Sequence, residues 1–538
     1  MSEVTRKQKE KSTALFELIK SLTGPEKRYF KIFAQRHVIG DQNNYIRLFD
    51  SIELQEVHDE EALLHKFKKD KFAKQLHRIK NYLYDLVMKS LCEFHRAKTI
   101  SSEVRLKLEM IDILYAKGLI QHAEKYLENI KELAEMYEQY QYLPEISELE
   151  RRVLNSQFYA GKTEEDLEKL HGRYKDSLNV LDEINNNWLR AMRLMLFLNA
   201  QGPARNKKEL EYIEKRFEED KPEVCNVKSF EACNYFYFNY GMYYRLRGDE
   251  EKSYEYSLKS LHWYDQHAFF IKERLRSYLA LLYNFLGISL SLNRFDKTFF
   301  DVLGKLEKLP EEYAGAPQNN NYLLLMHFNA VNTIKLSHII ATGKFEDGLL
   351  LIKTIQEGMK SFGDKIEPII EFNFYFSFAR IYFTAGNFQK ANENLNKIIN
   401  SGKVQRNDIY CFSKIMSLLV HYEMGKFDLL EYSVVSTYRY LLKRNRLYKV
   451  ENIILDYIRK KAPLIDSEKK QLEAFTELKA LLEGATKNDH FEARALEYFD
   501  LISWLESKIT GKKFADVVAE KISKPDYRPN ILNDFVNV

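Results

Sequence analysis

The stretch YFSFARIYFTAGNFQKA, residues 375–391, decides the fold that we expect for most of the chain. Apolar side chains recur at helical spacing up to Gly386, and a second periodic run starts at Phe388 and continues to Ile398. A glycine readily takes up the left-handed backbone conformation that ends a helix tightly. The stretch therefore predicts two helices joined by a short turn at Gly386.

Small residues predict how these two helices pack. Ala379 in the first helix and Ala391 in the second leave room for the two helices to approach closely. Phe388, just after the turn, is placed to fill the space between them. We therefore expect an antiparallel helical hairpin.

This pattern resembles the tetratricopeptide repeat. That family has an aromatic residue early in its first helix, a small residue three before a tyrosine, a turn glycine, and then an aromatic and a small residue in its second helix. Here those places are held by Tyr375, Ala379, Tyr382, Gly386, Phe388 and Ala391. The resemblance implies a stack of hairpins in which one stripe of each first helix lines a groove.

Looser copies of the pattern occur along the chain. Gly118, Gly248, Gly343 and Gly425 each mark a turn between two periodic runs, and in one further copy Asn293 stands in a turn that has no glycine. The turns recur at about 40–50 residues, longer than the 34 of the standard repeat. We therefore expect longer helices and an irregular array.

Length and composition agree with a repeat architecture. The 538 residues exceed the roughly 250–300 at which a single hydrophobic core stops growing. The chain holds 20 Gly and 10 Pro, and the scarcity of these helix-breaking residues favours a mostly helical protein. Several domains or a stack of repeats would satisfy both observations.

We therefore expect an all-α protein, a tetratricopeptide-like helical-hairpin solenoid with a small helical N-terminal domain. The N-terminal domain is expected over residues 1–100 and the repeats over 101–445. Degenerate repeats with a capping helix are expected over 446–522, and a docked or disordered tail over 523–538. A generic helical bundle is the alternative, because periodic alanine and aromatic residues occur in any helical core. The chain is also similar to long helical-repeat proteins found in some bacteria, which implies no activity.

The N-terminal region predicts five helices in place of repeats. Thr23 is the expected cap of the second helix, where Pro25 takes a favoured first helical position. Near the other end of the chain, the amphipathic pattern of residues 491–508 predicts one capping helix. The five expected N-terminal helices cover residues 12–22, 25–34, 44–52, 59–67 and 71–96.

No motif in the sequence predicts catalysis or a cofactor. Glu168 and His171 have a spacing used in di-iron sites, but those sites need a second such pair, which the sequence does not contain. The four cysteines form no CxxC pair of the kind that zinc modules use. We expect no catalytic residue, cofactor or metal, and interpret the chain as a non-enzymatic scaffold or adaptor that binds a protein or peptide.

The sequence contains no targeting or membrane signal. Its first residues, MSEVTRKQKEKS, lack the apolar centre of a secretory signal, and no run approaches the ~18 continuous apolar residues of a membrane span. The net charge of +4 gives no overall case for nucleic acid. We expect a cytoplasmic protein without a membrane span.

Aromatic runs are the strongest indication of a binding surface. Residues 234–238 and 372–376 each open an expected first helix with aromatic rings on several sides, and these rings cannot all face one partner helix. Asn and Arg on the same stripe are suited to clamping a peptide backbone or carboxylate. The alternative is simple burial against a neighbouring repeat. By the resemblance, the partner-binding groove consists of Tyr235, Phe238, Arg245, Asn284, Asn373, Phe376, Arg380 and Tyr422.

A basic stretch in the N-terminal region supports a second hypothesis. Residues 1–100 hold 20 Lys and Arg against 14 Asp and Glu, and residues 64–78 interleave cations with apolar side chains. The candidate basic surface consists of Lys66, Lys69, Lys74 and Arg78, and Lys80 is expected to extend it. It predicts either contact with nucleic acid or an acidic partner, or a solvated outer helix face. In the first case the chain would be a regulator whose repeats sense a peptide or protein.

Overall fold

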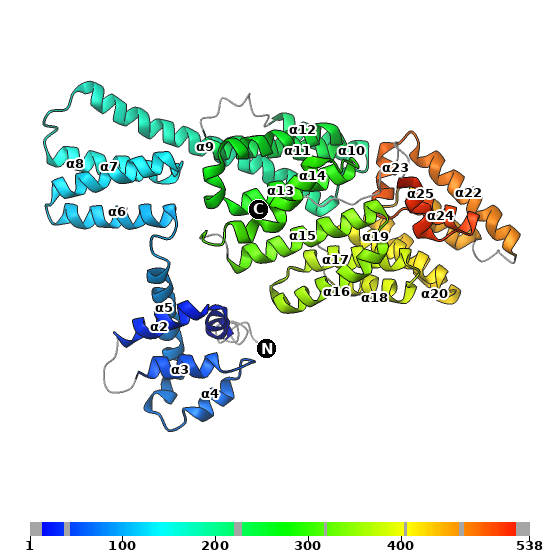
Figure 1. Cartoon of the computed structure of the whole chain (residues 1–538), viewed down its shortest axis with the longest axis horizontal. Coiled ribbons are helices and arrows are strands. Elements are labelled where there is room, and N and C mark those ends of the chain that lie inside the picture. The colour runs from blue at the N-terminus through cyan, green and yellow to red at the C-terminus, as the bar shows by residue number, and fades with distance from the viewer. Residues whose placement is uncertain are drawn as a thin grey trace. The chain divides into compact units, whose positions relative to one another are not determined.

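The structure of the chain, a computed structural model, describes residues 13–36, 43–219, 229–316, 320–402, 406–461 and 467–522. Over these ranges the chain forms helices and no strand, so the expected all-α fold is confirmed. The predicted tail, residues 523–538, lies outside the described residues. The chain divides into two compact units, Met1–Thr163 and Glu164–Val538, each of which is described by itself (Figure 1).

The first unit begins with short helices around an apolar core of their own. Phe30, Leu48, Phe49 and Leu83 are almost fully buried in this core. Thr23 caps the second helix as expected, because its hydroxyl accepts from the backbone N–H of Glu26 and its own N–H donates to the Glu26 carboxylate at 2.7 Å. The helices are residues 13–21, α2 (Gly24–Gln35), α3 (Asn44–Glu53), α4 (Glu60–Lys66), the 3-10 helix η1 (Lys71–Gln75) and α5 (Leu76–Phe94).

The expected long helix over residues 71–96 is wrong in its first part. A 3-10 segment, η1, replaces its first turn, and the α-helical part begins only at Leu76. The break brings the Phe72 ring to 5.1 Å from the buried Phe67 ring, a contact that packing favours over a straight helix.

The rest of the first unit consists of three helices around a second core. Consecutive helices pack on each other, and Gly118 has the positive φ expected of a turn glycine. The elements are α6 (Ile100–Ala116), α7 (Ile120–Met136), the 3-10 helix η2 (Tyr140–Tyr142) and α8 (Leu143–Ser156).

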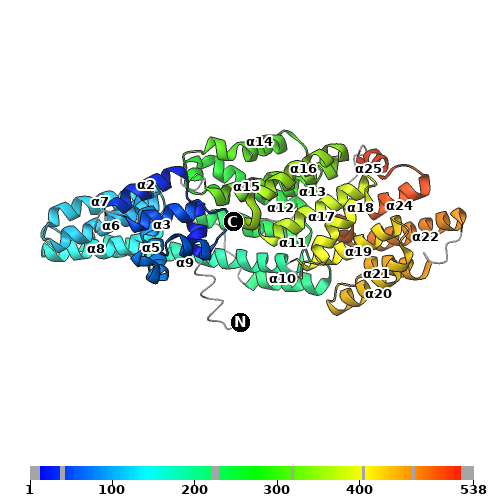
Figure 2. The same cartoon turned by 90° about the horizontal axis from the view of Figure 1, so that it is seen from below.

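The second unit starts with a long helix and continues in pairs of consecutive helices (Figures 1 and 2). Its first elements are α9 (Glu164–Gln201), α10 (Lys207–Glu219), α11 (Phe230–Arg247), α12 (Glu250–Gln266), η3 (Ala268–Glu273), α13 (Leu275–Ser291), α14 (Lys297–Glu312), α15 (Asn321–Thr342), α16 (Phe345–Phe362), η4 (Gly363–Lys365), α17 (Pro368–Thr384), α18 (Phe388–Ile399), α19 (Asn407–Glu423) and α20 (Phe427–Lys443).

The hairpin predicted from residues 375–391 is present as α17 and α18. Gly386 has a φ of +74° between the two helices, and Ala379 and Ala391 are fully buried where the helices meet. Phe388 packs its ring at 5.2 Å from that of Phe383. The expected turn without a glycine, between α13 and α14, places Asn293 at a φ of +53°, which asparagine tolerates better than most residues.

The first helices of these hairpins also contact one another. α13 packs on α15, α15 on α17 and α17 on α19, in addition to the partner helix of each hairpin. Two large apolar cores follow each other along the second unit, one around α13 and one around α17. Neighbouring pairs thus share buried surface, an arrangement compatible with a helical repeat protein.

The C-terminal helices share the apolar core around α17, and α25 packs on α15. The expected single helix over residues 491–508 is wrong: the chain breaks before Leu501, where Asp500 accepts from the backbone N–H of Ser503 and caps a new helix. The elements are α21 (Lys449–Asp456), the π-helix η5 (Tyr457–Lys461), α22 (Glu468–Thr486), α23 (His490–Ala493), η7 (Arg494–Glu497), α24 (Leu501–Thr510) and α25 (Phe514–Ile522).

Candidate partner-binding pocket

A pocket lies between α11, α12 and α13. α11 and α13 are the first helices of two consecutive hairpins, and both pack on α12. The lining of the pocket begins at the second residue of α11, a helix that Ser229 caps by accepting from the N–H of Ala232. Its lining residues are Glu231, Asn234, Tyr235, Tyr237, Phe238, Gly241, Ser257, Ser260, Arg274, Ser277, Ala280, Leu281 and Asn284.

One ion pair lies in the lining. The Arg274 guanidinium lies 3.6 Å from the carboxylate of Glu231, which is half exposed. The same guanidinium lies over the Phe270 ring at 4.7 Å and the Phe230 ring at 5.4 Å, so its position is fixed by packing. The paired charges leave this part of the pocket without a net charge.

Uncharged polar groups make up much of the remaining lining. The side-chain oxygen of Asn234 accepts from the Ser260 hydroxyl in a long contact of 3.5 Å. Burial, together with the charge of Glu231, raises the pKa of Tyr235 to about 12, so that its hydroxyl stays protonated at neutral pH and can donate. The pocket therefore offers hydrogen bonds to an uncharged or backbone group.

The floor of the pocket is a glycine inside a helix. Gly241 has ordinary helical geometry, and a Cβ built on it would lie 3.7 Å from the Ser257 hydroxyl, an ordinary contact distance. Its carbonyl accepts from Ser253 at 2.8 Å. Packing of α11 on α12 therefore does not require glycine here, although glycine in a helix costs about 0.5–1 kcal/mol relative to alanine. The missing methyl group leaves space in the pocket.

The size of the pocket limits what it can hold. Its volume is about 120 Å³, below the roughly 300–1,000 Å³ of pockets that hold small-molecule ligands. A side chain of a docked peptide suits this volume better than a complete cofactor.

Three of the predicted groove residues meet in this pocket. Tyr235 and Phe238 come from α11 and Asn284 from α13. Reasoning from sequence missed Arg274, Glu231 and the serines of the floor. The sequence holds a signal for Ser257 and Ser260, because together with Ser253 they are small residues at helical spacing along one face of α12.

Two other predicted groove residues lie in the interior. Arg245 is 2% exposed, forms an ion pair with Glu250 at 2.5 Å and lies 3.9 Å from Glu497. Phe376 is buried in the core around α17. Their helices have apolar neighbours on several sides, so the stripe that the family pattern assigns to the groove is covered.

The last three predicted groove residues are Arg380 and Asn373 on α17 and Tyr422 on α19. Arg380 lines a separate cavity of about 30 Å³ together with Asp500 and Phe514. The Tyr422 hydroxyl accepts from the amide of Gln471 at 3.1 Å. Asn373 is half-buried, and its side-chain oxygen has no hydrogen-bond partner among the described residues. The eight predicted residues therefore do not line one continuous groove.

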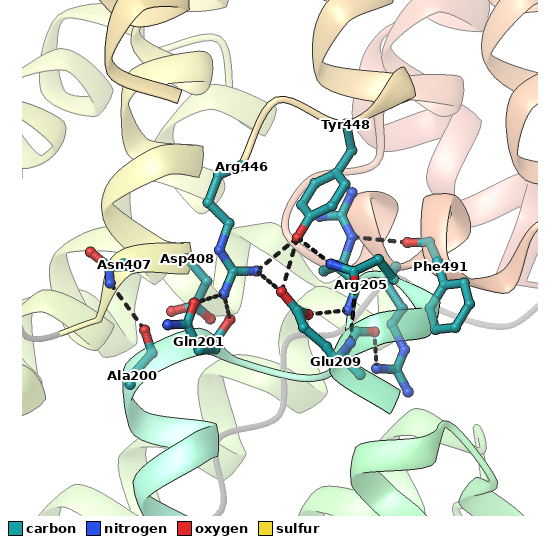
Figure 3. A network of polar contacts seen from close by, with 12 residues as sticks. Ala200, Gln201, Arg205, Glu209, Asn407, Asp408, Arg446, Tyr448 and Phe491 are labelled. Carbon is teal, nitrogen blue, oxygen red and sulfur yellow. Dashed lines mark hydrogen bonds and ion pairs between the residues drawn. The ribbon is translucent and has the colours of Figure 1, made fainter. Parts of the chain in front are cut away.

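A buried polar network fixes the C-terminal segments on the rest of the second unit (Figure 3). Arg205, in the loop between α9 and α10, donates to the Phe491 carbonyl at 2.9 Å and to the Glu451 carboxylate at 3.0 Å. Arg446 donates to the Gln201 carbonyl at 2.7 Å. These contacts join residues more than two hundred positions apart, and no local pattern in the sequence indicated them.

A buried carboxylate continues the network. Asp408 accepts from Arg406 at 2.6 Å and from the Tyr498 hydroxyl at 2.8 Å. Burial acts to raise the pKa of Asp408, but the Arg406 charge and these hydrogen bonds outweigh it, so the pKa lies below its usual value. The carboxylate is therefore charged at neutral pH and is matched on every side by protein groups, as expected for a structural site.

The predicted basic residues all lie in the first unit. Lys66, Lys69, Lys74 and Arg78 are all exposed. Lys80 is not part of that surface, because its side chain is buried and forms an ion pair with Glu60.

Among the described residues, no group of three or more His, Cys, Asp and Glu side chains could hold a metal ion. None of the helices described is long and apolar enough to cross a membrane. No family model, curated protein or solved structure matches this chain.

Proposed function

We propose that this chain is a tetratricopeptide-like repeat protein that holds a protein partner, and that a segment of the partner docks in the pocket between α11, α12 and α13. The single observation that carries the proposal is the floor of this pocket, where a helix keeps glycine although alanine would fit. Gly241 stands three before Tyr244, where the repeat pattern has a small residue for packing, and glycine in place of alanine leaves extra space that a docked segment would use.

The chemistry of the lining supports a peptide as the ligand. Aromatic side chains supply apolar contact, and the amides of Asn234 and Asn284 can hydrogen-bond a peptide backbone. The Arg274–Glu231 pair cancels its own charge, so the site has no preference for a strongly charged segment. We expect the docked segment to place one uncharged side chain, aromatic or amide, in the pocket.

The proposed role is that of a cytoplasmic scaffold or adaptor without catalytic activity. From α13 to α19, the first helix of each hairpin packs on the first helix of the next one, as in repeat proteins that present an extended binding surface. The docking pocket lies at one point of that surface.

Photo-crosslinking in the native host tests the proposal. A photoreactive benzoylphenylalanine replaces Tyr237 in the pocket, or Phe300, which is 51% exposed on α14 outside it. Each is introduced into the otherwise unchanged chain and into a chain carrying Gly241→Leu, which fills the pocket floor.

We expect one protein adduct at position 237 that is absent at position 300 and is lost with Gly241→Leu. Circular dichroism should show the same melting behaviour for the two backgrounds. The same adducts at both positions, or an adduct at position 237 that persists with Gly241→Leu, would contradict docking in this pocket.

A further inference from the structure

The junction between α4 and α5 in the first unit is the segment 67–75, which contains the 3-10 helix η1. Arg47 holds this junction through two hydrogen bonds to the Asp70 carboxylate, at 2.9 and 3.1 Å. Its guanidinium lies 5.5 Å from the centre of the Phe67 ring, which is 1% exposed. These contacts anchor the junction to α3, which carries Arg47.

Exposed cations surround this junction without compensating charges. Asp70 is the only acidic residue in positions 64–80, and Arg47 neutralises it. Elsewhere in the unit, Lys27, Lys31 and Lys80 form ion pairs with carboxylates. No ion pair joins the exposed cations of the junction to any part of the chain that the structure describes. These cations are Lys66, Lys68, Lys69, Lys74 and Arg78.

The first turns of α5 expose side chains that can read base edges. Gln75, Arg78 and Asn81 are all exposed just before or within these turns. Arginine pairs with guanine, and asparagine and glutamine pair with adenine, in the major groove of DNA. In helix–turn–helix proteins, the residues that contact bases also lie near the N-terminus of the second helix.

We propose that the junction of α4 and α5 binds double-stranded DNA. The first turns of α5 enter the major groove, which is wide enough for a helix. Lys66, Lys69 and Lys74 contact the phosphates on either side. This site lies in the first unit and is independent of the pocket proposed for a protein partner.

Binding of a fluorescent 30-base-pair duplex to the full chain tests the proposal between 50 and 200 mM salt. The variant combines Lys66→Ala, Lys69→Ala, Lys74→Ala and Arg78→Ala. The matched control removes four exposed lysines that also have no ion pair within the described residues, through Lys125→Ala, Lys207→Ala, Lys208→Ala and Lys353→Ala. Both quadruple variants lose the same net charge.

We expect the unchanged chain to bind with an affinity that falls steeply as salt rises. Each phosphate contact removed lowers the slope of log affinity against log salt by about 1. The slope should therefore fall by about 3 in the junction variant, which removes three phosphate contacts, and hardly change in the control. Equal losses in the two variants, or no binding by the unchanged chain at micromolar concentration in 50 mM salt, would overturn the proposal. Equally tight binding of polyglutamate would also overturn it and would assign the surface to an acidic protein.

Discussion

Helices α11 and α17 start from nearly the same local sequence and end in different surroundings. Each opens on an aromatic run, residues 234–238 in α11 and 372–376 in α17. Beside α11 the lining of aromatic and amide groups stays open as a pocket. The phenylalanines of the α17 run lie in the core, and Arg380 lines a small cavity with residues just before α24 and on α25.

At the end of α17, segments distant in sequence decide how much of the repeat surface is available. Four residues that line the cavity beside Arg380 lie more than one hundred positions further along the chain: Phe499, Asp500, Phe514 and Val518. The polar network around Arg205 fixes those C-terminal segments in place. The comparison therefore depends on that network, on the contacts of α25 and on the glycine in the pocket floor, and each can be changed separately.

The largest expected effect comes from removing Arg205. Arg205→Ala leaves the Glu451 carboxylate buried without its partner, and breaking a buried ion pair in this way costs about 3–5 kcal/mol. Urea unfolding of the second unit should show this loss. The double variant Arg205→Met with Glu451→Met removes both charges and should recover most of the stability. A double variant as unstable as the single one would contradict the assigned pairing.

The next effect is a dependence of stability on pH. The pKa of Asp408 is lowered in the folded state below its ordinary value of 3.8. The stability that its charge contributes is therefore present above the unfolded pKa and is lost as pH falls through the folded pKa. Asp408→Asn should cost roughly 2–3 kcal/mol at pH 7, as expected for hydrogen bonds to a charged group.

Urea unfolding of both chains between pH 7 and pH 2.5 measures this difference. The gap between the original chain and Asp408→Asn should stay constant down to about pH 5 and shrink below it. A gap that does not change with pH would show that the carboxylate charge contributes nothing to folding.

A smaller effect is expected where α25 covers the hairpins. Val518 is 5% exposed, and Val518→Ala removes about 1–2 kcal/mol of apolar contact. Local detachment of α25 should then make trypsin cleavage at Lys512 and Lys513 about tenfold faster, since 1.4 kcal/mol corresponds to a factor of ten. The exposed change Asp516→Asn on the same helix serves as control and should leave the rate unchanged.

The smallest expected effect concerns the pocket beside α11. Gly241→Ala should raise the free energy of unfolding by about 0.5–1 kcal/mol, because alanine favours a helix and its Cβ meets no clash. Thermal unfolding measures the gain. A loss of stability would mean that close packing of α11 on α12 requires the glycine, and the argument from the pocket floor would fail.

Local features of the fold could be predicted from the sequence because neighbouring residues determine them. The cap at Thr23, the turn at Gly386 and the small residues at 379 and 391 all depend on short-range geometry. The breaks before Leu76 and Leu501 could not be predicted, since the apolar period continues across both positions. Ring packing and a side-chain cap determine these two breaks.

The sequence predicted the residues of the candidate site only where no segment distant in sequence covers them. Tyr235, Phe238 and Asn284 meet as expected, because α11, α12 and α13 follow each other along the chain. Arg380 and Tyr422 follow the same pattern but contact segments whose position depends on long-range ion pairs. A sequence pattern carries no information on which distant charges will pair.

The placement of Arg205 has a consequence for how the protein is made. The residue lies 246 positions before Glu451, its ionic partner. At a translation rate of about 5–20 residues per second, the ribosome needs on the order of 10–50 s to add that partner. Until Glu451 has been added, Arg205 has no such partner, so this contact of the second unit can form only late in synthesis. Slower or faster translation of the last hundred codons should therefore change the yield of native protein more than the same change earlier in the message.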